Sequence, residues 1–366
     1  MIVKNCIQLN TDCEGPCCLN DNAFELCKDF LKPNGDRFFR QISRYDDYMA
    51  EMFKKQGYKA GDTLKLILPF LKAYDLTNKK ILDYSIETVR LVSGVEETYR
   101  FLRSLKFPIF EISTSYSQFA LAVGAKLGID KDHIFSTELD LDRYKITTAE
   151  VNALKKLKSE IIGLPEIELP ETVQTFNDLN QKTKNTITRL DQIFWKIIPR
   201  MKIGIMYQEI NPIGGSEKVR AMHQSLIQTG LPLSNVIYIG DSITDVQAFK
   251  EVRAGGGLAV SFNGNCHAVK NAEFIVIANS AWPIVVISTV FILRGKAGVL
   301  ELAHQGLPPA LDTLGLPLEW TNVISAGLEG RQTEIYLAGA EKHNEIVAKS
   351  FEMCSNLRGK AIAALG

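Results

Sequence analysis

Two acidic stretches of this sequence have the residue types and spacing of a site for a hard cation. The stretch DCEGP (residues 12–16) follows an apolar run, and so does GDSITD (residues 240–245). Carboxylate oxygens suit Mg²⁺, which proteins usually hold through one or two carboxylates together with a substrate phosphate. An aspartate after a strand can be merely a helix N-cap, but the pairing of two such stretches favours a shared cation.

The elements that must position these acids can be read from the pattern of apolar runs. Helical patterns over 94–105, 118–127 and 217–229 separate the runs, and this alternation predicts an α/β fold with a doubly wound parallel sheet. Ligands bind such sheets beyond the carboxyl ends of the strands. The runs end at Asp12, Thr114, Ser242, Gly264 and Ala278.

The first run is unusual for a buried parallel strand, because Gln8 and Asn10 interrupt its apolar residues. We still expect it to be a strand. Asp12, Ser113 and Asp241 should then meet in one crevice.

Two helical stretches interrupt this alternation. Residues 24–92 are expected to form a helical cap, and residues 147–200 a second, hairpin-like insertion that opens with a capping box from Thr147 to Glu150. A longer helix is expected to begin near Glu171. Its apolar seam, spaced by three and four from Val173 onward, indicates packing within the chain or a homodimer contact through residues 171–198.

The remaining segments complete the predicted domain organisation. Residues 1–23, 93–146 and 201–293 should form the α/β core, and the alanine-rich stretch 294–366 a helical extension with a packing role only. The uncharged segment Phe274–Leu293 is long enough to span a membrane. Because Pro283 suits the first turn of a helix, we interpret the segment as a buried strand followed by a buried helix, with no membrane span.

Composition narrows the classes of function. The chain has 366 residues, with 42 Lys plus Arg and 42 Asp plus Glu, so no overall charge favours nucleic acid. Seven cysteines and an N-terminus without a secretory signal favour a reducing, cytoplasmic location. A small-molecule substrate fits these features better than a polymer.

Taken together, these motifs resemble those of the haloacid dehalogenase-like (HAD) phosphohydrolase superfamily. The loop DCEGP occupies the place of the family's Asp-x-Asp-Gly-Thr motif, and Ser113 that of the Ser or Thr ending the next strand. Lys218 in GGSEK is the candidate for the family's lysine, although a solvated surface lysine would fit the same pattern. The turn GDSITD matches the Gly-Asp-x-x-x-Asp motif, and GLAVSFNGN after it resembles phosphoserine-phosphatase-like members.

The resemblance implies a Mg²⁺-dependent phosphatase acting on a small phosphorylated substrate. Asp12 would attack the phosphorus and form an aspartyl phosphate, Glu14 would be the acid and base, and Lys218 would neutralise charge. The implied metal ligands are Asp12, Glu14 through its carbonyl, and Asp241, with Asp245 close by, and the implied phosphoryl-binding residues are Gly15, Ser113, Thr114 and Ser115.

Two departures from the family motif leave an alternative open. Glu14 is one methylene longer than the usual aspartate, and Pro16 replaces a hydroxyl residue and lacks an N–H. The Asp-x-Glu-Gly-Pro loop is also similar to that of archaeal HAD-like proteins labelled subunit R of energy-converting hydrogenase A. The alternative is therefore a catalytically impaired binding or assembly subunit.

The cysteines around the first motif raise the question of a thiolate metal site. Their spacing lacks the paired Cys-x-x-Cys pattern of structural zinc sites, and no histidine follows at ligand spacing. We interpret Cys13, Cys17 and Cys18 as small buried residues that pack at the entrance of the cap.

Overall fold

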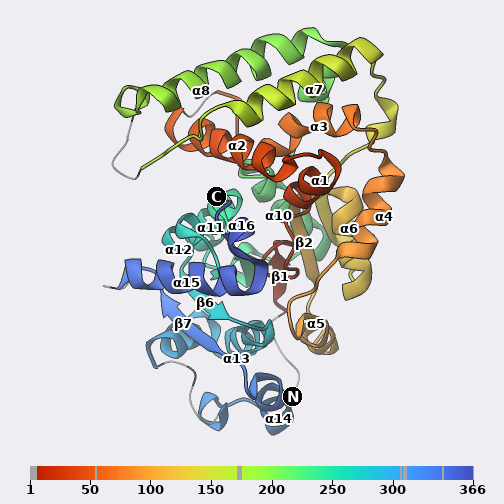
Figure 1. Ribbon diagram of the computed structural model, residues 1–366. Coiled ribbons are helices and arrows are strands. Elements are labelled where there is room, and N and C mark those ends of the chain that lie inside the picture. Colours follow the sequence, from red (N-terminus) through yellow and green to blue (C-terminus); the bar gives the residue numbers. More distant parts are fainter. Residues whose placement is uncertain are drawn as a thin grey trace.

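A seven-stranded sheet in the order β3-β2-β1-β4-β5-β6-β7 lies at the centre of the protein (Figure 1). The computed structural model describes residues 6–53, 56–170, 175–305, 307, 311–339 and 342–365. Strands β1 to β6 run parallel, and β7 pairs with β6 in the antiparallel direction. The strands are β1 (Gln8–Thr11), β2 (Ile109–Tyr116), β3 (Ile134–Thr137), β4 (Val236–Gly240), β5 (Leu258–Phe262), β6 (Phe274–Ala278) and β7 (Thr333–Leu337).

The five runs predicted as strands are confirmed as β1, β2, β4, β5 and β6, and the doubly wound α/β class is confirmed with them. Two edge strands were missed. β3 has four residues, too few to show a periodic pattern. β7, with the sequence TEIYL, lies inside the stretch 294–366, so the prediction of an all-helical extension is wrong there. Its β-branched and aromatic residues carried the signal that the alanine-rich surroundings hid.

A buried polar network explains the unusual composition of β1. The side chain of Gln8 donates to the Asn10 side chain at 2.7 Å and to the Ser225 hydroxyl at 2.6 Å, and Asn10 donates to the same hydroxyl at 3.0 Å. Thr229 donates to the Gln8 carbonyl oxygen at 2.7 Å. Ser225 and Thr229 belong to helix α10 (Ser216–Thr229), so these bonds fix α10 against β1 without leaving a buried polar group unpaired.

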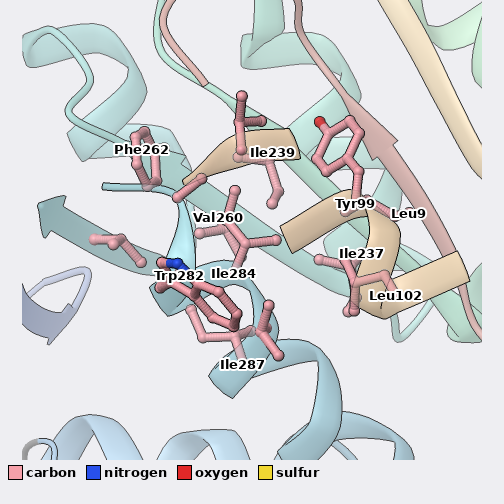
Figure 2. Close-up of a cluster of buried hydrophobic side chains, with 14 of the residues drawn as sticks. Leu9, Tyr99, Leu102, Ile237, Ile239, Val260, Phe262, Trp282, Ile284 and Ile287 are labelled. Atoms are coloured by element: carbon pink, nitrogen blue, oxygen red, sulfur yellow. The ribbon is translucent and has the colours of Figure 1, made fainter. Parts of the chain in front are cut away.

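Helices cover both faces of the sheet. On one face α5 (Val95–Ser104), α6 (Ser117–Leu127) and α13 (Trp282–Gln305, interrupted at Gly295) pack in one apolar cluster. Figure 2 shows part of it, with Leu102 from α5 near Ile237 of β4, and Trp282 from α13 near Ile284 and Ile287. On the other face lie α10, α11 (Val246–Ala254) and α12 (Cys266–Asn271).

The segment that resembled a membrane span is a buried strand followed by a helix, as expected from the sequence. Phe274–Ala278 forms β6, and α13 begins at Trp282 with Pro283 in its first turn. By length and composition Trp282–His304 could cross a membrane, but 67% of its most apolar window is buried inside the protein. Core helices share this pattern.

The two helical insertions share one apolar cluster. The capping box of Thr147 and Glu150 is present. The first insertion contains α1 (Asn22–Phe30), α2 (Gly35–Asp47), a π-helical turn (Tyr48–Phe53), α3 (Thr63–Ala73) and α4 (Asn78–Thr88), and the second contains α7 (Thr148–Gly163) and α8 (Gln181–Gln192). Figure 1 shows α7 and α8 lying over α2 and α3, with α4 beside α6.

The predicted start of the second long helix needs correction. Helix α8 begins at Gln181, because the Asn180 side chain accepts from the Thr183 N–H at 2.8 Å and caps it there. Glu171 and Val173 lie outside the described residues. Further along the seam, Ile187, Leu190 and Phe194 are fully buried within the chain. The homodimer contact stays a prediction, and these three side chains are not exposed to take part in it.

The remaining C-terminal elements lie against the sheet edge and the cap. Helix α14 (Leu318–Leu328) packs on α13, whereas α15 (His343–Arg358) packs on β6 and α12. The short α16 (Lys360–Ala363) follows α15, and its Ile362 belongs to the cap cluster. The chain thus ends between core and cap, and Figure 1 shows the C-terminus there.

A matched pair of isoleucines tests this assignment of the core. Ile237 is fully buried at the centre of the sheet, whereas Ile227 is 81% exposed on α10. We expect Ile237→Ala to lower the free energy of unfolding by about 2–5 kcal/mol through lost burial and a residual cavity. Ile227→Ala should change it by less than about 0.5 kcal/mol. Urea unfolding followed by circular dichroism measures both, and similar losses would contradict the assignment.

Candidate active site

The predicted acids meet at the carboxyl ends of β1 and β4. These strands are neighbours, with Thr11 opposite Ile239, and the Asp12 N–H donates to the Ile239 carbonyl at 2.8 Å. One carboxylate oxygen from each of Asp12, Asp241 and Asp245 lies within 4.8 Å of the others. The convergence expected from the two motifs is therefore present.

Lys218 joins two of these acids. Its ammonium group lies 2.5 Å from Asp12 Oδ2 and 2.7 Å from Asp245 Oδ1, and its side chain is fully buried. A lysine at this depth is stable as a cation only because the two carboxylates compensate its lost hydration. The solvated-surface interpretation of Lys218 is therefore wrong. The polar network between β1 and α10 holds its helix in place.

Asp245 is engaged by the protein on both carboxylate oxygens. Oδ1 accepts from Lys218 and from the Tyr238 hydroxyl at 2.9 Å, and Oδ2 accepts from the N–H groups of Asp241 and Ser242 at 3.1 Å each. A Cβ at Gly240 would lie 2.3 Å from the Asp245 carboxyl carbon, so the motif needs glycine there. Asp245 is thus placed to shape the turn and hold Lys218. Each Asp12 oxygen accepts a single bond from the described residues, from the Cys13 N–H or from Lys218, so Asp12 and Asp241 are better placed to bind a cation.

Gly15 has a different role from the predicted one. Its N–H donates to the Cys18 carbonyl at 2.9 Å, so it is not free to bind a phosphoryl oxygen. Its φ of +94° disfavours other residues, and a Cβ there would lie 2.1 Å from Asp241 Oδ2. Glycine at this position lets the first acidic loop approach Asp241. Pro16 costs this loop no bond, since its turn uses the N–H groups of Gly15, Cys17 and Cys18.

The hydroxyl groups at the end of β2 divide into two kinds. The Ser113 hydroxyl accepts from the Ser115 N–H at 3.1 Å, and Ser113 is not part of the crevice wall. Thr114 and Ser115 do line the crevice, and their buried hydroxyls have no hydrogen-bond partner. Because unpaired buried hydroxyls are rare, these two are the better candidates for binding a phosphoryl oxygen.

Glu14 lines the crevice on the side of the cap. Its Oε1 accepts from the Asn22 N–H at 2.7 Å at the start of α1. Burial raises the pKa of Glu14 well above its ordinary value, and the nearby charge of Asp21 adds to the rise. The carboxyl group is therefore suited to carry and donate a proton.

Arg358, at the end of α15, is a site residue that the sequence did not reveal. Its Nη1 lies 2.9 Å from Asp241 Oδ2, Nη2 donates to the Asn20 carbonyl at 2.5 Å, and Nε donates to the Leu19 carbonyl at 3.3 Å. The packing-only prediction for residues 294–366 is therefore wrong at this position. No local pattern distinguishes Arg358 from a basic residue in the last turn of any helix.

The cysteines of the first loop are buried, but not at the cap entrance. Cys13, Cys17 and Cys18 belong to the sheet core beneath α5, and Cys17 Sγ lies 2.9 Å from the Tyr99 hydroxyl. Burial raises the pKa of each of these thiols, which keeps them protonated. Cys13 Sγ and Cys18 Sγ are 4.0 Å apart. The thiols thus support the loop by packing.

The charge balance of the crevice fits a divalent cation. Burial raises the pKa of Asp12 above its ordinary value, although Lys218 opposes the rise, and raises that of Asp241 to about 6 against the effect of Arg358. The two cationic groups do not neutralise all the carboxylates around them. The oxygen atoms of Asp12 and Asp241 are ligands that suit Mg²⁺. The carboxylates concerned are Asp12, Asp21, Asp241 and Asp245, and the cations are Lys218 and Arg358.

These shifts predict the pH dependence of stability without metal. Between pH 3.8 and about 6, Asp241 is ionised in the unfolded chain but holds a proton in the folded protein, so folding binds a proton. Stability from this group is complete at low pH and is lost as the pH rises toward about 6. In a chelator, the free energy of unfolding should therefore fall between about pH 4 and about pH 6.

Two variants test whether the site causes this pH dependence. Asp241→Asn should make the fall with pH shallower, because the titrating carboxyl group is removed. Asp83→Asn, at an exposed carboxylate paired with Lys79, should leave it unchanged. Urea unfolding at a series of pH values measures the slope. A stability that rises over this range, or equal slopes for all three proteins, would contradict the assignment.

Comparison with known proteins agrees with this geometry. A family model described as haloacid dehalogenase-like hydrolase matches residues 109–285, which contain β2, Lys218 and the second acidic motif. No curated protein matched the sequence. A solved gene product of Archaeoglobus fulgidus is similar over 98% of this chain and 99% of its own, with 26% identity and a TM-score of 0.79.

Two phosphoserine phosphatase structures are more distant. A substrate-bound form has 13% identity and a TM-score of 0.48 over 77% of this chain and 98% of its own. An apo form has 13% identity and a TM-score of 0.44 over 74% of this chain and 92% of its own. No conclusion about this chain rests on either. The family match over residues 109–285 and the arrangement of Asp12, Lys218, Asp241 and Asp245 agree with the resemblance to haloacid dehalogenase-like hydrolases that the sequence motifs indicate.

Proposed function

We propose that this protein is a Mg²⁺-dependent phosphatase that hydrolyses a small phosphate monoester through an aspartyl phosphate on Asp12. The observation that carries the proposal is the position of the Asp12 carboxylate. Lys218 holds it at the carboxyl end of β1, beside Asp241. Mg²⁺ bound by Asp12 and Asp241 would neutralise charge on the transferring phosphoryl group.

In the first step Asp12 supplies the attacking oxygen. Oδ1 accepts from the Cys13 N–H at 2.7 Å and Oδ2 is bonded to Lys218, so the carboxylate is oriented before substrate arrives. A bond forms between an Asp12 oxygen and phosphorus while the ester P–O bond breaks. Lys218 stabilises the negative charge of both the carboxylate and the phosphoryl group.

Glu14 supplies the proton that the leaving oxygen needs. Its raised pKa keeps the carboxyl group protonated before this step, and its position on the crevice wall places it on the side of the cap. The ionised Glu14 then accepts a proton from the water that attacks the aspartyl phosphate. This second step releases inorganic phosphate and regenerates Asp12 and the Glu14 acid.

The end of β2 would bind the phosphoryl oxygens. The unpaired hydroxyls of Thr114 and Ser115 would donate to them, and these bonds strengthen as charge spreads in the transition state. Cap residues Phe39 and Ser43 line the opposite side of the crevice. Residues of the cap would therefore contact the organic part of the substrate and contribute to selectivity.

Removing the nucleophile tests the proposal directly. With 4-nitrophenyl phosphate and Mg²⁺, the wild-type protein should release phosphate, and a chelator should stop the reaction. Asp12→Asn should lower kcat by at least about 10³-fold, because the covalent step is lost. The exposed Asp83→Asn is the matched control and should keep wild-type activity. A folded wild-type protein inactive on a broad panel of phosphate monoesters would contradict the proposal and favour the assembly-subunit alternative.

The role of Glu14 predicts a dependence on the leaving group. Glu14→Gln should lower kcat by about 10²-fold or more, because proton transfer is lost while the side-chain size is kept. The loss should be larger with an alkyl phosphate than with 4-nitrophenyl phosphate, whose leaving group needs no proton. Steady-state kinetics with both substrates measures it.

Glu14→Asp is the conservative control for this prediction. It should retain more activity than Glu14→Gln, since a carboxyl group remains in the loop. Equal losses on the two substrates would show that Glu14 does not protonate the leaving oxygen.

A further inference from the structure

The C-terminal segment, residues 343–365, forms part of the wall of the crevice. Of the described residues that line it, six come from this segment: Phe351, Cys354, Arg358, Ile362, Ala363 and Leu365. The cavity between cap and core has a volume of about 160 Å³. Small-molecule sites usually measure about 300–1,000 Å³, so the segment leaves little room beyond a phosphoryl group.

Contacts with both core and cap hold the segment in this position. The Ser350 hydroxyl donates to the Gly264 carbonyl at 2.6 Å, in the loop that follows β5. On the other side, Arg44 of α2 donates to the Ala364 carbonyl at 3.3 Å, and Ile362 is buried in the cap cluster. The segment therefore bridges the two bodies whose separation would open the crevice.

Arg358 is the charged contact at the centre of this bridge. Its guanidinium group is bonded to Asp241 Oδ2, and its side chain is only 10% exposed. Among the described residues that line the crevice, Arg358 is the one basic side chain. It places a positive charge on one of the two carboxylates best suited to bind the cation.

A guanidinium group and a divalent cation on the same carboxylate oppose each other. Both are attracted by the charge of Asp241, and two positive charges bound to one buried carboxylate repel each other. If cation binding weakens the hold of Asp241 on Arg358, then by linkage the docked segment weakens cation binding by the same factor.

We infer that Arg358 competes with the divalent cation for Asp241, so that Mg²⁺ binding releases the C-terminal segment 343–365 from the crevice. This inference rests on the Mg²⁺ site of the proposed function. In the absence of cation, Arg358 neutralises Asp241 and the segment closes the site. Cation binding takes over the charge of Asp241, the bridge loosens, and the crevice opens for substrate.

Calorimetric titration of the full chain with Mg²⁺ tests the competition. Arg358→Met removes the charge and keeps much of the apolar stem, and we expect it to bind Mg²⁺ about 10-fold tighter than the wild type, within the usual range of coupling between sites. Arg143→Met is the matched control, because Arg143 forms its ion pair with Glu209 and neither residue lines the crevice. It should bind Mg²⁺ with wild-type affinity.

Hydrogen exchange measured by mass spectrometry tests the release. In the wild type, Mg²⁺ should speed amide exchange in peptides covering 343–365 and leave those of α13 unchanged. In Asp241→Asn, exchange in 343–365 should already be fast without Mg²⁺ and should not respond to it. These measurements need no substrate and no turnover.

The outcomes separate this inference from the proposed function. Equal or weaker Mg²⁺ affinity in Arg358→Met, or slower or unchanged exchange in 343–365 with Mg²⁺, would overturn the competition while leaving the phosphatase proposal in place. A complete lack of Mg²⁺ binding by both the wild type and Arg358→Met would overturn the Mg²⁺ site and the inference together.

Discussion

The ion pairs of one buried lysine hold the site together. Lys218 has no exposed side-chain surface and lies between Asp12 and Asp245. Burial opposes its charge, but the two carboxylates outweigh that effect and raise the pKa of Lys218. Removing Lys218 would leave two buried carboxylates without the cation between them, so the charges of Asp12 and Asp245 depend on this one side chain.

This requirement explains features that are otherwise unusual. β1 is polar because Gln8 and Asn10 anchor α10 through Ser225, and α10 carries Lys218. Tyr238 lies within β4, where its hydroxyl donates to Asp245. These buried polar bonds help to position the acidic cluster, where accurate placement matters more than the apolar contacts they replace.

The cap and the C-terminal segment decide what can reach these groups. Both insertions share one apolar cluster, and Ile362 from the last helix belongs to it. The cap, the core and the C-terminal segment therefore meet around the small crevice, and Arg358 connects this segment to the acidic cluster. In the proposed phosphatase, the same contacts would couple access of substrate to the charge state of Asp241.

The sequence alone determined the α/β class, five strands and the two acidic motifs, because each is a local pattern. Apolar runs indicate buried strands, and an acidic residue directly after such a run marks the carboxyl end of the strand. The strand β7 was not predicted, because its short edge-strand pattern lies within an alanine-rich stretch.

Only the tertiary structure decided which polar groups face the crevice. Ser113 and Gly15 use their hydroxyl and N–H within the protein, whereas Thr114 and Ser115 remain unpaired. Arg358 meets Asp241 from 117 residues away along the chain. Such contacts depend on how separate elements pack, and no spacing within a single segment records that.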